Sequence, residues 1–194
     1  MTEVQSALAR ALADVSELAP FALVGGLAVS VRAEPRLTRD VDLAVSVADD
    51  AAAEGVVIQL RRRGYGLRTV LEHRTGRMAT ARLTTPGDSG VLVDLLFFSS
   101  GVEPEIVAAA QVLTVAGDLV APVATGAHLL AMKVLSEDER QRPNDRDDIL
   151  ALLREPETEL AQARALLALI SDRGLDRGRD LAARLASFVA EAGR

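Results

Sequence analysis

The sequence predicts a mixed α/β (α+β) domain that is followed by a C-terminal helical bundle. In the first part of the chain, short apolar runs bounded by Gly and Pro, as in buried strands, alternate with segments of helical periodicity. From Thr125 onward the periodicity is helical almost throughout. No repeat or low-complexity segment interrupts this order, so we expect two domains, residues 1–122 and residues 123–194.

Two sets of segments follow from these patterns. The expected strands are 21–24, 41–45, 65–71, 77–83, 91–98, 112–115 and 119–121. The expected helices are 2–18, 26–31, 50–63, 103–110, 125–135, 146–153, 157–170 and 176–192. Asp49 or Asp50 is expected to cap the helix that runs to Arg63, and Gly64 ends it.

The composition restricts the chemistry that this chain can perform. The 194 residues include no Cys, which excludes disulfides, zinc–thiolate sites and cysteine nucleophiles. His73 and His128 are the only histidines, so a metal ion would be held by oxygen atoms. The N-terminal segment lacks the basic start and continuous apolar run of a signal peptide, and no stretch approaches the ~20 apolar residues of a membrane span. We therefore expect a cytoplasmic protein without a membrane partner.

The segment 23–45 carries the first candidate site. Asp40 and Asp42 stand two residues apart at the start of a predicted strand, so their side chains point the same way. Adjacent carboxylates repel each other unless a cation such as Mg²⁺ lies between them. Upstream, the turn at Gly25 and Gly26 opens a helix whose free N–H groups attract phosphate. This combination favours metal-dependent phosphoryl or nucleotidyl transfer. An ordinary turn beside a solvated strand end is the alternative.

Asp94 is the one charged residue of the apolar run VLVDLLFF. Burial of an ionised carboxylate in such a strand is costly unless the carboxylate is paired or binds a metal ion. Sites with two metal ions use carboxylates that bridge both cations, and a third carboxylate from a neighbouring strand completes such a set. Asp94 is therefore a candidate metal ligand. The alternative is that it lies at a strand end, where it caps a loop or pairs with an arginine.

Lys133 is the only lysine in the chain and lies in an otherwise apolar helix. We expect its stem to pack and its ammonium group to reach a polar place, such as the α- or γ-phosphate of a triphosphate. A surface lysine is the alternative. Asp145 and Asp148 follow, three residues apart on one face of the next helix. They either cap that helix or orient Lys133 or the substrate base.

At these places the sequence resembles the nucleotidyltransferase-fold toxins of the AbiEii and MenT type, within the polymerase-beta-like superfamily. The resemblance rests on GGLAVSVRAEPRLTRDVDL near the N-terminus and on the later MKVLSEDERQRPNDRDDILAL. The second stretch matches the family's K…R-x-x-D-x-x-D-I/L segment. Together the two frame residues 21–153, and they imply a nucleotidyltransferase-type mixed sheet with helices.

The resemblance also implies roles for individual residues. Asp40 and Asp42 would hold Mg²⁺ or Mn²⁺, and Asp42 is the safer assignment because some members carry Ser or Thr in place of Asp40. Lys133 would bind the triphosphate. Asp148 would be the essential late acid, with Asp145 as the second choice. The implied nucleotide-binding residues are Gly25, Gly26, Thr38, Arg39 and Lys133.

Family members transfer nucleotides from a nucleoside triphosphate to the 3′ end of tRNA, which prevents its charging, and a neighbouring antitoxin controls them. Such an acceptor fits the segment 61–82, where seven arginines oppose one acid in a chain of net charge −6. The helix dipole also favours three of these arginines, which is the structural alternative. Tyr65 is the only stacking residue there, so recognition would rely on shape and charge. The arginines expected to contact RNA are Arg61, Arg62, Arg63, Arg74 and Arg77.

Two other functions remain open at this point. A nucleotidyltransferase that modifies a small molecule such as an aminoglycoside, or a protein hydroxyl, would not need the arginine cluster. A catalytically degenerate nucleotide-binding or partner-binding module would not need Asp42. The intact carboxylates argue against the second of these functions.

Overall fold

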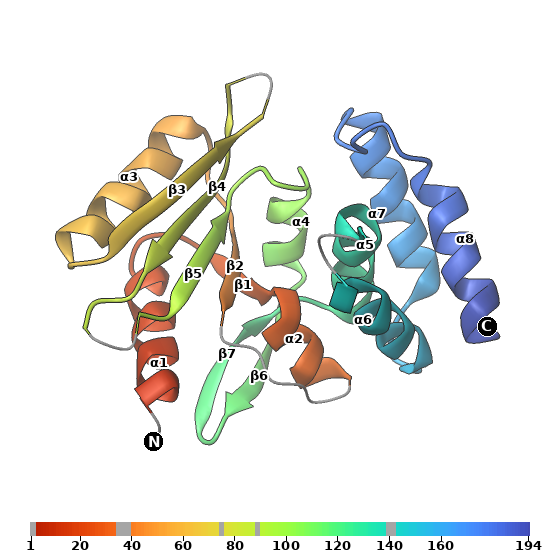
Figure 1. The fold of residues 1–194 in the computed structure, drawn as a ribbon, viewed down its shortest axis with the longest axis horizontal. Helices are drawn as coiled ribbons and strands as arrows, with labels where there is room; N and C mark the ends of the chain where they lie inside the picture. The colour runs from red at the N-terminus through yellow and green to blue at the C-terminus, as the bar shows by residue number, and fades with distance from the viewer. Residues whose placement is uncertain (1–2, 34–39, 74–75, 88–89, 139–142) are drawn as a thin grey trace.

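A computed structural model describes residues 3–33, 40–73, 76–87, 90–138 and 143–194 of the chain. Within these residues, seven strands form one sheet in the order β3-β4-β5-β2-β1-β7-β6 (Figure 1). The strands are β1 (Phe21–Val24), β2 (Val41–Val45), β3 (Gly66–Glu72), β4 (Met78–Thr84), β5 (Leu92–Leu96), β6 (Gln111–Ala116) and β7 (Leu119–Val123). The pairs β2–β5 and β1–β7 are parallel and the other neighbours are antiparallel, so the sheet is mixed.

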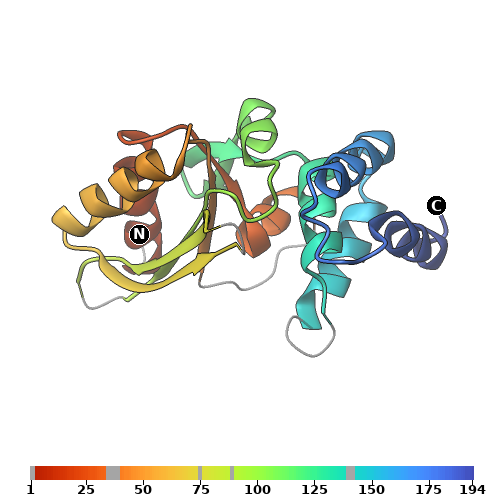
Figure 2. The same cartoon turned by 90° about the horizontal axis from the view of Figure 1, so that it is seen from above.

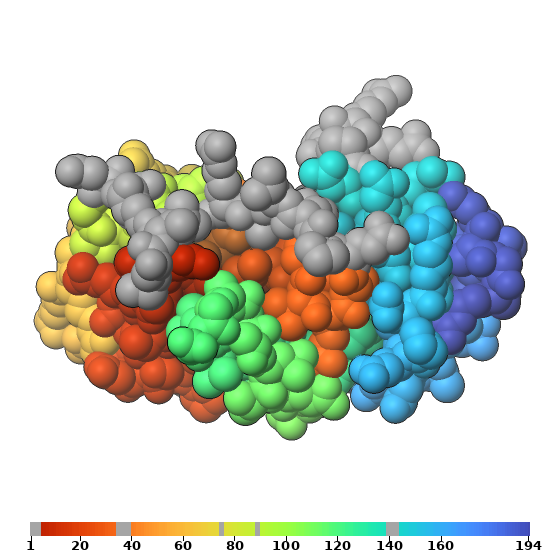
Figure 3. Space-filling view, turned by 90° about the horizontal axis from the view of Figure 1, so that it is seen from below, coloured from red at the N-terminus to blue at the C-terminus, as the bar shows by residue number. Residues whose placement is uncertain are grey.

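The helices lie on both sides of this sheet and beside it. They are α1 (Glu3–Ser16), α2 (Gly25–Arg32), α3 (Asp50–Arg62), α4 (Glu103–Ala108), α5 (Gly126–Ser136), α6 (Pro143–Arg154), α7 (Leu160–Asp172) and α8 (Leu181–Ala192). Figure 2 shows α3 and α4 on one side of the sheet and α2 on the other. On the face drawn in Figure 3, α2 lies between the β6–β7 hairpin and the C-terminal helices. None of the described helices is both long and apolar enough to span a membrane.

The predicted order of strands and helices is confirmed, and the differences lie at the ends of elements. β1 and β2 have the predicted bounds. β5 ends at Leu96 rather than at Phe98. α8 begins only at Leu181, because Arg177 and Gly178 have φ values of 60° and 71°, which a right-handed helix cannot contain.

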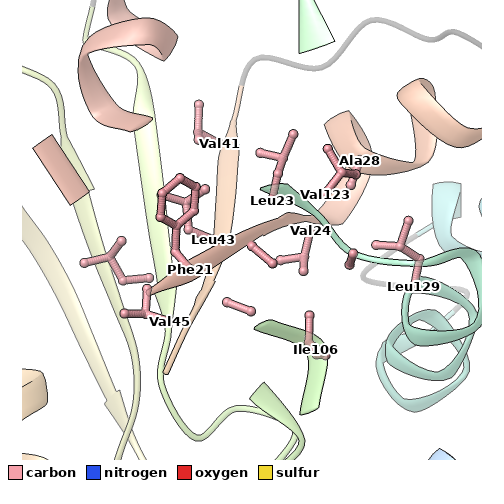
Figure 4. Close-up of a cluster of buried hydrophobic side chains, with 14 of the residues drawn as sticks. Phe21, Leu23, Val24, Ala28, Val41, Leu43, Val45, Ile106, Val123 and Leu129 are labelled. Atoms are coloured by element: carbon pink, nitrogen blue, oxygen red, sulfur yellow. The ribbon is translucent and has the colours of Figure 1, made fainter. Parts of the chain in front are cut away.

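A buried apolar row runs across the centre of the sheet. Leu23, Leu43, Leu95 and Ala81 stand at matched positions of β1, β2, β5 and β4, and each is fully buried. Figure 4 shows Leu23 and Leu43 within this cluster of buried side chains. Because strand side chains alternate between the two faces, the residues that follow or precede this row on each strand point to the opposite face.

The four helices after β7 form the C-terminal part of the chain. α5 packs against α6 and α7, and it also contacts α2 beside the sheet. Its side chains at Leu129, Leu130 and Val134 are fully buried, as the apolar sequence of this helix requires. The division into two domains, residues 1–122 and 123–194, stays a prediction. The contact between α5 and α2 joins these two parts of the chain.

A polar network connects α1 with the end of α3. Arg63 Nη1 donates to Asp14 Oδ1 at 2.9 Å, and the Tyr65 hydroxyl donates to Asp14 Oδ2 at 2.8 Å. Burial is the largest influence and would raise the pKa of Asp14, but these two hydrogen bonds and the charges of Arg63 and Arg10 together lower that pKa. Tyr65 is 3% exposed and therefore cannot stack on a nucleic-acid base, which corrects the expectation for this residue. Arg63 also pairs with Glu17, so the structure gives this arginine a packing role.

We predict that Asp14→Asn destabilises the protein by about 1 kcal/mol at neutral pH, since a partly screened ion pair and a hydrogen bond are lost. A carboxylate with a lowered pKa stabilises the fold fully above its ordinary value of 3.8, and the effect is lost as the pH falls through the lower pKa of the folded protein. Urea unfolding of both proteins at a series of pH values measures this difference. Glu54→Gln, at an exposed position of α3, is the matched control. Equal stability of the two variants at neutral pH would contradict the prediction.

Candidate active site

A cleft of about 640 Å³ lies over the sheet face opposite to the buried apolar row. Matched positions of neighbouring strands form its floor. One row consists of Thr69, Arg82, Asp94 and Asp42, and the next consists of Leu71, Thr80 and Leu96. α5 and the α7–α8 loop form its wall, through Leu129, Met132, Lys133, Leu135, Ser136 and Arg177. The register of the sheet therefore brings charged side chains of three strands together.

Gly25 and Asp42 are in close contact, and both line the cleft. Gly25 has a φ of +65°, a conformation that favours glycine, and a Cβ atom there would lie 1.9 Å from Asp42 Oδ2. The Asp42 carboxylate consequently rests on the backbone where α2 begins. Gly26 follows as a buried residue of the same helix. This close approach explains why the turn at the start of α2 contains glycine.

Asp40 and Asp42 are the oxygen donors that the sequence predicts for a metal ion, and of the two Asp42 lines the cleft. Asp40 directly precedes β2 and is half-buried, and Asp42 lies two residues further on, toward the same side. In the described part of the chain, no three His, Asp or Glu side chains converge as a metal site. Two carboxylates nevertheless suit Mg²⁺, which commonly combines one or two carboxylates with phosphate oxygens of a substrate. The residues present fit one such ion.

Asp94 lies beside Asp42 but is bound to an arginine. Its two oxygens accept hydrogen bonds from Arg82 Nε at 2.7 Å and Arg82 Nη2 at 2.6 Å. The pKa of Arg82 is raised mainly by this bidentate pair, and Asp40 and Asp42 add to the effect through their charge. Of the two interpretations of Asp94, the structure therefore shows the pairing with an arginine, and it places that pair inside the cleft.

Lys133 is buried between two acids of the following helix. Its Nζ atom donates to Asp145 Oδ1 at 2.6 Å and lies 2.7 Å from Asp148 Oδ2. Ser136 donates to the second oxygen of Asp145 at 2.7 Å. Asp145 and Asp148 thus orient Lys133, which is one of the roles considered for them, and Lys133 is not a surface lysine. The ammonium group lines the cleft opposite the sheet.

Arg177 is a residue of the cleft that the sequence did not indicate. It stands in the loop between α7 and α8 with a φ of 60°, and it lines both the cleft and a second cavity of about 1100 Å³. The basic side chains around the second cavity are His73, Arg77, Arg173 and Arg177, and the acid is Asp176. The sequence predicts a helix over this position, whereas the structure has a loop there, so its contact with the cleft could not be predicted.

The arginines expected to contact RNA do not form one surface. Arg77 lines the second cavity, where its guanidinium lies 3.4 Å from the centre of the Phe98 ring. Arg61 and Arg62 are exposed at the end of α3, and neither belongs to the lining of the two cavities among the described residues. Three predicted site residues, Thr38, Arg39 and Arg74, lie outside the described residues.

One protein family resembles this chain in sequence, and solved structures resemble it in fold. The model of the nucleotidyl transferase AbiEii toxins, of type IV toxin–antitoxin systems, matches residues 6–192. Among curated proteins, none matches the chain. One similar solved structure is the antibiotic-resistance factor ANT(2'')-Ia, with a TM-score of 0.55 and 16% identity over 89% of this chain and 95% of that one. Another is an antigenic nucleotidyltransferase-like protein from Paracoccidioides brasiliensis, with a TM-score of 0.49 and 19% identity over 95% of this chain and 92% of that one.

These findings settle the fold and the family. The likeness to ANT(2'')-Ia shows that the two chains share a fold, and the predicted nucleotidyltransferase-type mixed sheet with helices is confirmed. The family model spans both stretches on which the resemblance in the sequence rests and nearly all of the remaining chain. The chain therefore belongs to the AbiEii family of nucleotidyltransferase toxins.

Proposed function

We propose that this protein is an Mg²⁺-dependent nucleotidyltransferase that transfers nucleotides from a nucleoside triphosphate to the 3′ end of tRNA and so blocks aminoacylation. The observation that carries the proposal is the convergence of Gly25, Asp42 and Lys133 on one cleft from three separate parts of the chain. Transfer from a triphosphate needs a cradle for phosphate, a carboxylate for a divalent cation and a fixed positive charge. The AbiEii family match supports the same chemistry and a cognate antitoxin as partner.

Asp40 and Asp42 are the proposed ligands of Mg²⁺ or Mn²⁺. A metal ion bound there would polarise the phosphoryl oxygens and lower the pKa of the attacking hydroxyl. Val24 and Gly25 line the cleft where α2 begins, and Val24, its N-cap residue, makes no side-chain hydrogen bond to the helix. The first N–H groups of α2 are therefore suited to bind phosphate. Thr38 and Arg39 remain predicted nucleotide contacts.

Lys133 is the proposed triphosphate-binding cation, and Asp145 and Asp148 are its positioning residues. An ammonium group has three N–H donors, and the two carboxylates engage two of them. Because Lys133 lines the cleft, the third donor is suited to a phosphate oxygen. Asp148, which the family resemblance favours as the essential late acid, and Asp145 both hold the lysine, so we assign the positioning role to both.

The second cavity is the proposed path of the RNA acceptor. It adjoins the cleft through Arg177, which lines both, and Arg77 and Arg173 add basic charge along it. Arg77 is 47% exposed, so its guanidinium can exchange its weak contact with Asp50, at 3.9 Å, for a phosphodiester. Arg173 is engaged by Glu105 and is the less available of the two. An acceptor 3′ end that follows this path reaches the cleft beside Arg177.

Incubation with tRNA, Mg²⁺ and each labelled nucleoside triphosphate tests the proposed activity. We expect label on the tRNA 3′ end with at least one triphosphate, and a loss of about 100-fold or more in Asp42→Asn because a metal ligand is removed. Asp118→Asn, in the exposed turn between β6 and β7, should retain full activity. Label on an aminoglycoside or a protein in place of tRNA would overturn the RNA acceptor. Absence of any transfer, with growth indifferent to expression of the protein, would overturn the enzyme itself.

Gly25→Ala should abolish transfer while the fold persists. A Cβ atom at this position collides with Asp42 Oδ2, and the positive φ adds strain of about 1 kcal/mol or more, so the carboxylate has to move. Gly117→Ala, in the turn between β6 and β7, carries the same kind of backbone strain with no neighbouring atom within 4 Å and is the matched control. Transfer rates and thermal melts of both variants measure the effect. A Gly25→Ala variant with the activity of Gly117→Ala would show that the contact with Asp42 is unimportant.

Arg77→Gln should weaken the interaction with tRNA without affecting that with the triphosphate. Loss of one phosphate contact is expected to raise the KM for tRNA several-fold and to reduce the slope of log affinity against log salt by about 1. Steady-state kinetics at several salt concentrations measure both quantities. Arg164→Gln, at an exposed position of α7, is the control for the change of charge. If both variants have the salt slope of the unmodified protein, the acceptor does not follow the second cavity.

A further inference from the structure

Arg82 and Asp94 form a bidentate pair within the floor of the cleft. β4 and β5 place them directly opposite each other, and β2 places Asp42 on the other side of Asp94. Both Asp94 oxygens accept from Arg82, at 2.7 and 2.6 Å. Bidentate pairs of this type fix the guanidinium in position and orientation. Asp94 therefore has a dedicated partner on the side away from the two candidate metal ligands.

The two members of this pair differ in their exposure. The Asp94 side chain is 11% exposed, whereas the Arg82 side chain is 46% exposed and lines the cleft. A guanidinium group has five N–H donors, and Asp94 engages only Nε and Nη2 of Arg82. The buried carboxylate thus fixes the position of the arginine, and the guanidinium donors that Asp94 does not engage belong to a half-exposed side chain that lines the cleft. A planar cation presented in this way suits a phosphate group.

A role as third metal ligand would require the Asp94 oxygens to coordinate metal ions. Carboxylates that bridge two metal ions need oxygen lone pairs directed at both ions, about 3.5–4 Å apart. In Asp94 each oxygen already accepts a short, charge-assisted hydrogen bond from Arg82. Coordination of a cation by the remaining lone pairs would place a divalent ion beside the Arg82 guanidinium, and the two positive charges would repel each other. The contacts of Asp94 favour one metal ion, on Asp40 and Asp42, with Arg82 as a second, protein-borne positive charge.

We propose that Arg82 binds a phosphate group of the nucleoside triphosphate and that Asp94 is its positioning residue rather than a third metal ligand. The inference rests on the proposed function only in taking the cleft as the triphosphate site. It assigns the cleft two fixed cations, Arg82 on its floor in the sheet and Lys133 on its wall in α5. The phosphates would then lie between the sheet and the helix.

Binding of inorganic tripolyphosphate and of Mn²⁺ tests this assignment without any transfer reaction. Calorimetry without metal should show that Arg82→Met binds tripolyphosphate about tenfold more weakly, the effect of one charge-assisted hydrogen bond. Arg68→Met, an exposed arginine on β3 outside the cleft lining, should bind as the unmodified protein does. If Asp94 positions Arg82, the effect of Arg82→Met should shrink to about twofold in an Asp94→Asn background.

Electron paramagnetic resonance of Mn²⁺ separates the two roles of Asp94. We expect the affinity of Asp94→Asn for Mn²⁺ to lie within about twofold of that of the unmodified protein. Asp42→Asn should lose Mn²⁺ binding, because Asp42 is a proposed metal ligand and Asp94 is not. Arg82→Met leaves the buried Asp94 carboxylate without its partner, which costs stability. The double variant Arg82→Gln/Asp94→Asn avoids this unpaired charge, and it should show the same weak tripolyphosphate binding. A loss of Mn²⁺ in Asp94→Asn equal to that in Asp42→Asn would overturn the proposal, as would normal tripolyphosphate binding by both Arg82 variants.

These outcomes are distinguishable from a failure of the proposed function. Tripolyphosphate binding that depends on Arg82, together with an absence of nucleotide transfer, would support the assignment of Arg82 and overturn the enzymatic proposal alone. Transfer to tRNA with binding that is indifferent to Arg82 would do the reverse. The two proposals therefore stand on separate measurements.

Discussion

The pairing of β2 with β5 is the constraint on which the cleft depends. Their parallel register sets Asp42 beside Asp94, and β4 then sets Arg82 opposite Asp94. A shift of one residue in any of these strands would turn a charged side chain into the core and expose a leucine or alanine of the buried row. Burial of an unpaired charge and exposure of an apolar side chain are both unfavourable. The apolar row therefore fixes the register, and the register in turn fixes the chemistry on the opposite face.

The C-terminal helices complete the site from the other side. Lys133 reaches the cleft from α5, and α6 supplies the two acids that hold it. A compact ammonium group can be contacted by two carboxylates from different directions, whereas a planar guanidinium favours one bidentate partner. Arg82 with Asp94, and Lys133 with Asp145 and Asp148, show both arrangements within one cleft. The position of the lysine thus depends on how α5 and α6 pack together.

The local part of this structure could be predicted from the sequence, and the part that depends on distant contacts could not. Alternation and helical periodicity are properties of neighbouring residues. They were enough to predict the order of the strands, the spacing that turns Asp40 and Asp42 to one side, and the packed stem of Lys133. The partner of Asp94 depends on strand register, which pairs residues twelve positions apart. Tyr65 looked available for RNA in the sequence, but Asp14 of another helix holds it. Arg177 lies in a loop where the periodicity of the sequence predicts a helix, so its contact with the cleft was missed.

The charges around the cleft bear on why a divalent cation belongs in the proposed reaction. Among the described residues there, the acids are Asp40, Asp42, Asp94, Asp145 and Asp148, and the bases are Arg82, Lys133 and Arg177. Each of Arg82 and Lys133 is accompanied by carboxylates, and these carboxylates weaken its attraction for a triphosphate. Because Arg82 and Lys133 are already balanced by their own carboxylates, they orient phosphate more than they attract it. A cation on Asp40 and Asp42 would add positive charge at the place where the phosphates must lie. We therefore expect the metal ion to tighten binding of the triphosphate, which Arg82 and Lys133 also bind without it.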